Sequence, residues 1–499
     1  MAIPDPTQVA PWYLRNINQA LELDETTGNV FVRTNALVGN VTVGNVTVGN
    51  VGVTSLGNVD LSGNTLPVTI VGNLAGITGN VTIVDGGGSI TVDGNVNATI
   101  TGGNVATTIT GTNLDAFGRL RVSNPVTLFD SQNRYIDGEQ FSSITATSGN
   151  VVYVANESSF NLNVTAASGS SVIRQSKTVQ AYQPGKSLLT MNTFAMATLK
   201  ANLRQRVGYF TEGNGIYFEA NGTSLSLVIR SSTTGVVVEE RIAQASWNGD
   251  TLNGAGPSGI TLDPTLTQIF WNDIEWLGVG NVRAGFVING QFIVCHTFQH
   301  ANQPGNTTVY MTTATLNPRY EITNTGATSG VSTMKQICST VISEGGFTPS
   351  TKIGYVTNNT TATRVSSANT VTSLCSIRLN PAYPDAVVIP AQVDLLLLDV
   401  RYGQFQLIEN ATIANASFSN VAGSVVQSAI HTDTITNGTV VYAGLNSSRD
   451  EVEIGEDIKK RLQLWRYANG TPSTLTLAVA YTATNADLLY KFGWEELTN

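Results

Sequence analysis

The stretch NVRAGFVINGQFIVCHTF, residues 281–298, places two apolar segments on either side of Asn289 and Gly290. Asn-Gly is the preferred two-residue turn between antiparallel strands, because both of its residues accept positive φ values. The stretch NGTSLSLVIRSS, residues 221–232, starts with another Asn-Gly pair and then alternates apolar and polar side chains. Short strands with turn signals about every 8 to 12 residues are typical of sandwiches and jelly rolls. We therefore expect an all-β fold, with a jelly-roll-like β-sandwich over residues 115–350.

Two other segments have a pattern that is less clearly that of a strand. Residues 187–206, SLLTMNTFAMATLKANLRQR, are evenly balanced between helix and strand, because their first half is rich in threonine. Residues 456–467, EDIKKRLQLWRY, predict a short helix, since Ile458, Leu462 and Trp465 fall on one helical stripe.

Residues 36–114 form a segment of their own, which contains no lysine, arginine or aromatic residue and is built from units such as GNVTV. In an extended triplet the two valines share one face, and the following Gly-Asn pair turns the chain. One such strand cannot bury its valines alone, as in repeat proteins generally. Three chains wound together would solve this, and so would a single-chain solenoid; the high valine content disfavours a flexible linker. The irregular unit lengths favour a three-chain β-helical shaft.

The N-terminal segment, residues 1–35, differs from the shaft. Its stretch TQVAPWYLRNINQALEL, residues 7–23, fits a short amphipathic helix. Its main apolar side chains are Trp12, Leu14, Ile17 and Leu21. They are too few for a core and too apolar to leave in water, so we expect this segment to attach the chain to a partner.

The composition excludes several classes of protein. The formal net charge is −9 and only 12% of residues are charged, which argues against nucleic-acid binding because that requires clustered lysine and arginine. The N-terminus has no signal-peptide layout, and no apolar run reaches membrane-spanning length, so we expect cytoplasmic synthesis and no membrane insertion. The cysteines are three and far apart, which predicts free thiols.

Several short stretches resemble motifs that bind cofactors or metals, but none of them matches such a motif fully. QAYQPGKS, residues 180–187, lacks the first glycine of a phosphate loop, and GVGNVRAG, residues 278–285, has the wrong spacing for a dinucleotide site. His296 and His300 lie four residues apart without an evident third ligand, which favours packing over a metal site. We expect no cofactor, no metal and no catalytic residue, because the common hydrolase motifs are absent from the sequence.

The stretch WNDIEW, residues 271–276, offers the best candidate glycan contact: Trp271, Asp273 and Glu275. On a strand these three side chains share one face, with the two carboxylates roughly 7 Å apart. Aromatic rings beside carboxylates are typical of sugar clefts, and paired carboxylates are what a glycosidase needs. Packing in a sandwich core is the stronger alternative for the tryptophans.

Four strings resemble a family of virion structural proteins from tailed phages of marine bacteria, cyanobacteria especially, with relatives in large algal viruses. They are DAFGRLRVSNPVTLFDSQNRY (115–135), RVGYFTEGNGIYFE (206–219), DIEWLGVGNVRAGFVINGQ (273–291) and MKQICSTVISEGG (334–346). The resemblance implies a virus particle as the setting and a structural or fibre-like role. It implies no catalytic residue.

These observations lead us to expect a homotrimeric phage fibre or appendage protein, located in the virion. Residues 1–35 would dock on other virion proteins, residues 36–114 would form the shaft, and the β-sandwich head over 115–350 would recognise a host-surface glycan or protein. Residues 351–499 would be a C-terminal β domain, possibly continuous with the sandwich. One alternative is a capsid, neck or baseplate component whose head only packs against other virion proteins. The other is a fibre-borne polysaccharide depolymerase.

Overall fold

The computed structural model describes residues 21–23, 30–32, 123–135, 140–399, 401–447, 449–453 and 462–497. The chain divides into two units, residues 1–106 and 107–499. In the first unit β1 (Leu21–Leu23) pairs antiparallel with β2 (Val30–Val32). The prediction that Leu21 belongs to a helix is therefore wrong, because its backbone groups bond across to Val32 instead of along one turn. Trp12, Leu14, Ile17 and the shaft segment 36–114 lie outside the described residues.

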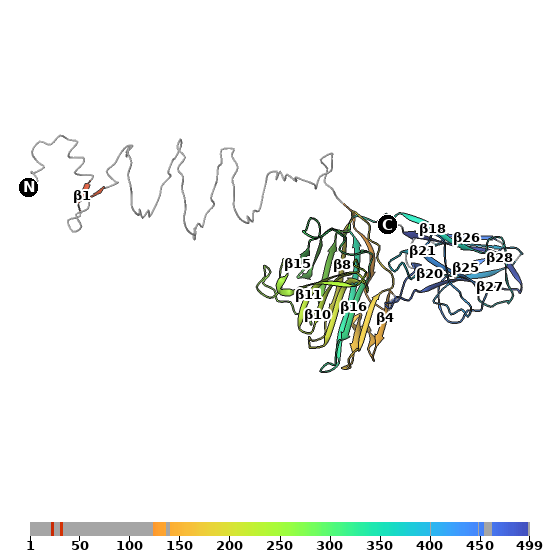
Figure 1. The fold of residues 1–499 in the computed structure, drawn as a ribbon, viewed down its shortest axis with the longest axis horizontal. Helices are drawn as coiled ribbons and strands as arrows, with labels where there is room; N and C mark the ends of the chain where they lie inside the picture. The colour runs from red at the N-terminus through yellow and green to blue at the C-terminus, as the bar shows by residue number, and fades with distance from the viewer. Residues whose placement is uncertain are drawn as a thin grey trace, which may run out of the picture. The chain divides into compact units, whose positions relative to one another are not determined.

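The second unit begins with a two-sheet sandwich, here called sandwich 1 (Figure 1). Its seven-stranded sheet has the order β12-β11-β10-β9-β16-β7-β4. The bounds of these strands are β4 Phe141–Ala146, β7 Ser171–Ser176, β9 Leu203–Phe210, β10 Gly215–Asn221, β11 Ser224–Ser231, β12 Val238–Ala243 and β16 Pro318–Asn324.

The facing sheet of sandwich 1 has eight strands in the order β15-β14-β13-β8-β17-β6-β5, with β3 also paired to β17. Their bounds are β3 Val126–Ser131, β5 Asn150–Val154, β6 Ser159–Val164, β8 Leu188–Ala195, β13 Gln268–Ile274, β14 Val282–Ile288, β15 Gln291–Phe298 and β17 Ser332–Ser343.

Sandwich 2 follows in the chain and has its own two sheets, one of five strands and one of six. The five-stranded sheet consists of β18 Thr351–Thr357, β19 Thr363–Val365, β21 Val388–Leu397, β26 Arg449–Glu453 and β28 Ala486–Leu497. The six-stranded sheet consists of β20 Thr372–Leu379, β22 Gly403–Glu409, β23 Ser419–Asn420, β24 Val426–Ile430, β25 Thr439–Asn446 and β27 Thr474–Tyr481.

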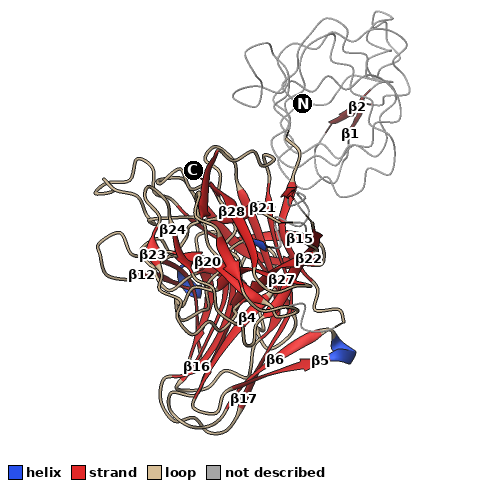
Figure 2. Ribbon diagram, turned by 90° about the vertical axis from the view of Figure 1, so that its right-hand side faces the viewer, coloured by secondary structure: helices blue, strands red, loops and turns tan. Residues whose placement is uncertain are grey.

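Strands account for nearly all regular structure in the described residues, and the helices there are two short 3-10 turns, Ala155–Glu157 and Gln244–Ser246 (Figure 2). The expectation of an all-β fold built from antiparallel sheets is confirmed. Among the residues that the structure describes, no helix has the length and apolarity that crossing a membrane requires.

The hairpin formed by β14 and β15 is the one that its Asn-Gly pair predicts. Ile288 lies opposite Gln291, so Asn289 and Gly290 alone turn the chain, with φ values of 53° and 77°. Two positive φ values at these positions are those of a type I′ turn, whose twist matches that of the flanking strands.

The two segments with uncertain patterns contain no α-helix in their described parts. Residues 187–206 supply β8 and the start of β9, where β-branched and aromatic residues pack on a sheet. The helix predicted over 456–467 is wrong for residues 463–467, because tertiary partners take the backbone groups: Leu464 N–H donates to the Val388 carbonyl at 2.9 Å, and the Trp465 carbonyl accepts from Ser473 N–H at 2.8 Å.

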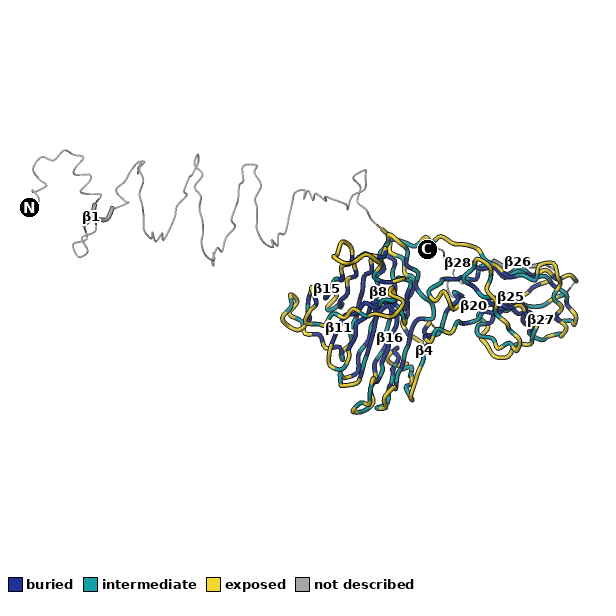
Figure 3. The backbone as a smooth tube through the Cα atoms, in the orientation of Figure 1, coloured by how far each residue is buried: buried dark blue, intermediate teal, exposed yellow. Residues whose placement is uncertain are grey.

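Each sandwich has its own hydrophobic core, and buried positions run along the strands (Figure 3). In sandwich 1 Phe218 of the seven-stranded sheet contacts three rings of the other sheet, with centroid distances of 5.1 to 6.2 Å. In sandwich 2 Trp494 is fully buried on the central strand β28. Inward side chains alternate with outward ones, so each sheet has a second face for other uses.

Candidate functional site

The outer face of the seven-stranded sheet carries an unusual set of side chains. On β10 Ile216 and Phe218 point into the core, so Tyr217 and Glu219 point outward. The register then places the outward charged residues of five neighbouring strands side by side. We call this set the arginine–glutamate ladder: Arg206, Glu219, Arg230, Glu239, Arg241, Arg319 and Glu321.

Ion pairs connect the ladder from one strand to the next. Arg319 donates from Nε to Glu321 Oε1 at 2.6 Å, and Arg206 forms an ion pair with the same carboxylate. Arg206 also lies 3.8 Å from Glu239 Oε1, which accepts from Arg230 Nε at 3.0 Å. Most of these groups are buried, so removal of one partner would leave a charge without compensation.

The ladder shifts the acidity of its carboxyl groups. Burial alone would raise the pKa of Glu239, but hydrogen bonds from Tyr217, Arg230 and Arg241 outweigh it and lower the pKa to about 2. Burial likewise opposes the effect of Arg319, Arg206 and Arg230 on Glu321, yet its pKa lies below the usual value. The ladder therefore holds both carboxylates in the charged form at neutral pH.

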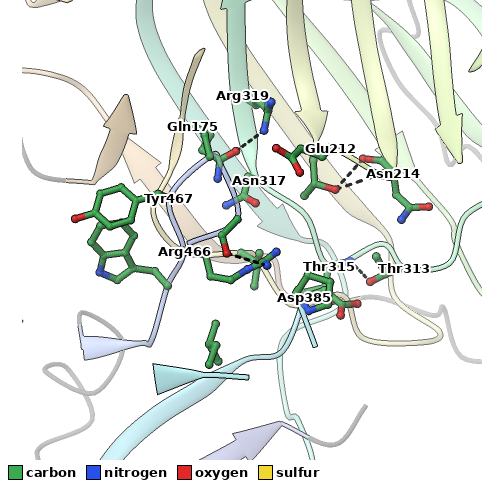
Figure 4. A pocket seen from close by; sticks show the side chains of 18 of the residues that line it. Gln175, Glu212, Asn214, Thr313, Thr315, Asn317, Arg319, Asp385, Arg466 and Tyr467 are labelled. Atoms are coloured by element: carbon green, nitrogen blue, oxygen red, sulfur yellow. Dashed lines mark hydrogen bonds between the residues drawn. The ribbon is translucent and has the colours of Figure 1, made fainter. Parts of the chain in front are cut away.

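A pocket of about 380 Å³ with both polar and apolar lining residues lies at the end of this face, between sandwich 1 and sandwich 2 (Figure 4). Gln175 and Arg319 line it, and they are joined by a hydrogen bond of 2.6 Å. Sandwich 1 also contributes the loop 211–214 and the segment 312–317, and sandwich 2 contributes residues 384–385 and 464–470. We call this the inter-sandwich pocket.

Arg466 is the central charged group of the pocket. Figure 4 shows it in the pocket with Glu212 of sandwich 1 and Asp385 of sandwich 2 nearby. Among the described residues its guanidinium donates one long hydrogen bond, 3.4 Å from Nη1 to the Gly470 carbonyl. Burial lowers the pKa of Arg466, against the opposing effect of the two carboxylates. Among the described residues no ion pair involves any of these three side chains, so their polar atoms are available to a ligand.

The wall that sandwich 1 contributes to the pocket includes several amides and hydroxyls. Asn214 Nδ2 donates to Ser232 Oγ at 3.0 Å and to Thr312 Oγ1 at 2.7 Å, while its Oδ1 accepts from the Thr312 backbone N–H at 3.1 Å. Asn317 Nδ2 donates to the carbonyls of Ser176 and Thr178. These buried amides fix the loops that present the threonine hydroxyls to the pocket.

Lys177 and Glu409 connect the two sandwiches beside the pocket. Lys177 Nζ lies 3.9 Å from Glu409 Oε2 and 4.8 Å from the ring centroid of Trp465, whose Nε1 donates to the same glutamate. Gln463 Nε2 adds a hydrogen bond of 3.1 Å to the Val179 carbonyl. The 462–470 loop is thus held against sandwich 1 by charge as well as by packing.

The predicted glycan contacts lie elsewhere, on the outer face of the eight-stranded sheet. Trp271 is buried against Phe292, with 5.3 Å between ring centroids, and Asp273 forms an ion pair with Arg283. Glu275 follows the end of β13, and its Oε2 accepts from Asn281 N–H at 3.4 Å. None of the three lines the inter-sandwich pocket, and their role as glycan contacts stays a prediction.

The two histidines considered for a metal have other partners. His296 Nδ1 accepts from Asn248 N–H at 3.1 Å, and His300 stacks on Tyr310 with centroids 3.9 Å apart. In the part of the chain that the structure describes, no three histidine, cysteine, aspartate or glutamate side chains gather in a way that could hold a metal ion.

Sequence reasoning did not identify Glu212, Asp385 or Arg466. Two signals were present: Glu212 belongs to a turn, TEGNG, between two strands, and Arg466 stands between two aromatic residues in WRY. Neither signal indicates that the segments meet, because the pocket is lined by residues as far apart in the sequence as Gln175 and Gly470.

No protein-family model matches the chain, and no curated protein matches it. Among solved structures, it is similar to a β-1,3-glucanase from Mycobacterium marinum at 13% identity, over 43% of this chain and 98% of that one, with a TM-score of 0.29. The CBM2 module of the evolved Dit of Lactobacillus casei BL23 phage J-1 is 7% identical over 46% and 100% of the two chains, with a TM-score of 0.29. A mixed linkage glucan GH16 protein from Bacteroides ovatus is 10% identical over 43% and 99%, also with a TM-score of 0.29. These likenesses assign no function, and the chemistry of the site has to indicate one.

Proposed function

We propose that the protein is a fibre or appendage protein of a phage virion, and that its inter-sandwich pocket binds a glycan on the host surface. The virion setting is supported by the four sequence strings described above. The observation that carries glycan binding is the set of free polar atoms on Arg466, Glu212 and Asp385, facing a wall of amides and hydroxyls.

The chemistry of the pocket suits a polyol. A sugar hydroxyl both donates and accepts hydrogen bonds, so it pairs well with a guanidinium on one side and a carboxylate on the other. Hydrogen bonds to charged groups are also stronger than those between neutral groups. The volume of about 380 Å³ falls in the range of roughly 300 to 1,000 Å³ that is usual for ligand pockets.

Binding without hydrolysis is the activity we propose. A glycosidase holds one carboxyl group protonated as an acid, usually by burial away from positive charge. Glu321 is a buried carboxylate that contacts the lining residue Arg319, and the arginines of the ladder keep it and the half-buried Glu239 charged. In the pocket itself Arg466 lies near both Glu212 and Asp385.

The test is Arg466→Ala in the full chain, measured by binding to polysaccharide extracted from host cells. We expect at least a tenfold loss of affinity, because two or more charge-assisted hydrogen bonds disappear. Arg364→Ala is the matched control: it also removes one arginine of sandwich 2, but that side chain is 63% exposed and pairs with Asp487 on β28.

Equal binding by Arg466→Ala and the wild-type chain would contradict the proposed site. When the wild-type chain is mixed with the same polysaccharide, we expect no new reducing ends to form. If the wild-type chain produces reducing ends and Asp385→Asn or Asp273→Asn does not, the depolymerase alternative would be supported instead.

A further inference from the structure

The inter-sandwich pocket contains three basic side chains, and two of them already have ion-pair partners. Arg319 donates to Glu321 at 2.6 Å and to Gln175 at 2.6 Å, and it shares Glu321 with Arg206. Lys177 is balanced by Glu409 at 3.9 Å. Only Arg466 remains as a cation without an ion-pair partner among the described lining residues.

The acidic residues of the lining have no such partner. Glu212 and Asp385 form no ion pair with any described residue, and both act electrostatically on Arg466. One free positive charge therefore faces two free negative charges. This excess of one negative charge offsets the excess of one arginine over the glutamates of the ladder, which reaches the pocket through Arg319, so the two sets together have no net charge. The remaining lining is mostly threonine, asparagine and apolar side chains.

From this balance we infer that the pocket selects uncharged sugars, that is, neutral hexose units of a host glycan, and rejects uronate or sulfated units. This inference rests on the proposed function. An acidic sugar would bring a third negative charge beside Glu212 and Asp385, with only one free guanidinium to offset it. An ammonium group on an amino sugar would have Arg466 beside it. A sugar hydroxyl is repelled by neither the carboxylates nor the guanidinium, because it donates to a carboxylate and accepts from the guanidinium.

Asp385 is the residue that decides between these classes. It lies on the loop between β20 and β21 of sandwich 2, opposite the hydroxyl wall of sandwich 1. If it accepts a hydrogen bond from a neutral sugar, its loss weakens binding. If it repels an acidic sugar, its loss strengthens binding. The two models therefore predict opposite signs for the same variant.

The experiment measures the binding of the full chain to an array of oligosaccharides built from neutral hexoses, hexuronates or hexosamines. We expect binding to neutral members, with an affinity that changes less than about twofold between roughly 50 and 500 mM salt, because no net ion pair forms with the ligand. Asp385→Asn keeps the side-chain shape and should weaken neutral-glycan binding about tenfold. Asp487→Asn removes a carboxylate outside the pocket and should leave the affinity unchanged.

Each other outcome overturns the inference. Preferred binding to hexuronates, or tighter binding by Asp385→Asn, would show an acidic ligand while leaving glycan recognition intact. Preference for a glucosamine oligomer over its N-acetylated form would show a cationic ligand. Unchanged affinity in Asp385→Asn would show that the carboxylate makes no contact. Failure of the wild-type chain to bind any glycan, including host polysaccharide, would overturn the proposed function as well.

Discussion

At the scale of single residues, the arginine–glutamate ladder makes the free energy of unfolding depend on pH. Glu239 has its pKa lowered from 4.5 to about 2, chiefly through contacts with Tyr217 and Arg230 against the effect of burial. A displacement of this size corresponds to roughly 3 kcal/mol of stability at neutral pH. Because the folded-state pKa lies below the unfolded-state value, this contribution is complete above about pH 4.5 and is lost as the pH falls toward 2.

We therefore expect Glu239→Gln to lower the free energy of unfolding at pH 7 by about 2 to 3 kcal/mol, and to flatten its dependence on pH between about 4.5 and 2. Urea unfolding at a series of pH values measures both effects. Glu240→Gln, which removes an exposed carboxylate from the same strand, should follow the wild-type curve. Parallel curves for Glu239→Gln and the wild-type chain would show that the ladder adds nothing to acid stability.

Single residues are also where the sequence predicted least about the site. Trp271, Asp273 and Glu275 stood out because aromatic rings and carboxylates alternate along one strand, and their role as glycan contacts stays a prediction. In the structure Asp273 forms an ion pair with Arg283, and Trp271 packs against Phe292. Glu212 and Arg466 gave only weak local signals. Their importance depends on neighbours supplied by distant parts of the chain, which local spacing cannot encode.

At the scale of elements, several glycines lie directly opposite aromatic rings on the next strand. Gly354 of β18 faces Trp494 of β28, Gly444 faces Phe405, and Gly403 faces Tyr481. In each pair a Cβ on the glycine would come within 2.8 Å of the aromatic residue. Glycine at these positions leaves the space that the large ring on the neighbouring strand occupies.

Gly354→Ala should destabilise the protein by more than about 2 kcal/mol, because the new methyl group would lie 2.4 Å from Nε1 of a fully buried indole. The control is Gly493→Ala, in the same sheet, where the methyl group would lie 3.6 Å from Gln392 Cβ, an ordinary contact. Thermal unfolding of the two variants measures the difference. Equal melting temperatures would mean that β18 moves away from the ring at no cost.

Elements were predicted better than residues. The Asn289–Gly290 hairpin and the strand after Asn221 follow from turn chemistry and alternation, which act over a few residues. The helix predicted around Trp465 fails because a three-residue apolar stripe is also compatible with a loop whose backbone bonds to Val388 and Ser473. Short periodic patterns cannot exclude such tertiary partners.

At the scale of the whole molecule, we propose that residues 36–114 join three chains. Light scattering on the purified chain should give the mass of a trimer, and deletion of 36–114 should give a monomer, because the valines of the repeats have no partner layer within one chain. Deletion of residues 1–35, the proposed attachment segment, is the control and should leave the trimer intact. A monomeric full chain, or a trimer that survives the loss of 36–114, would refute the three-chain shaft.

The inter-sandwich pocket also has a consequence for biosynthesis. The hydrogen bond from Gln463 to Val179 spans 284 residues, and at roughly 5 to 20 residues per second a ribosome needs about 15 to 60 s to synthesise that length. Sandwich 1 can fold during this interval, but Arg466 has not yet been added. The proposed glycan binding therefore requires a chain whose translation has passed Arg466, the last charged residue of the pocket lining.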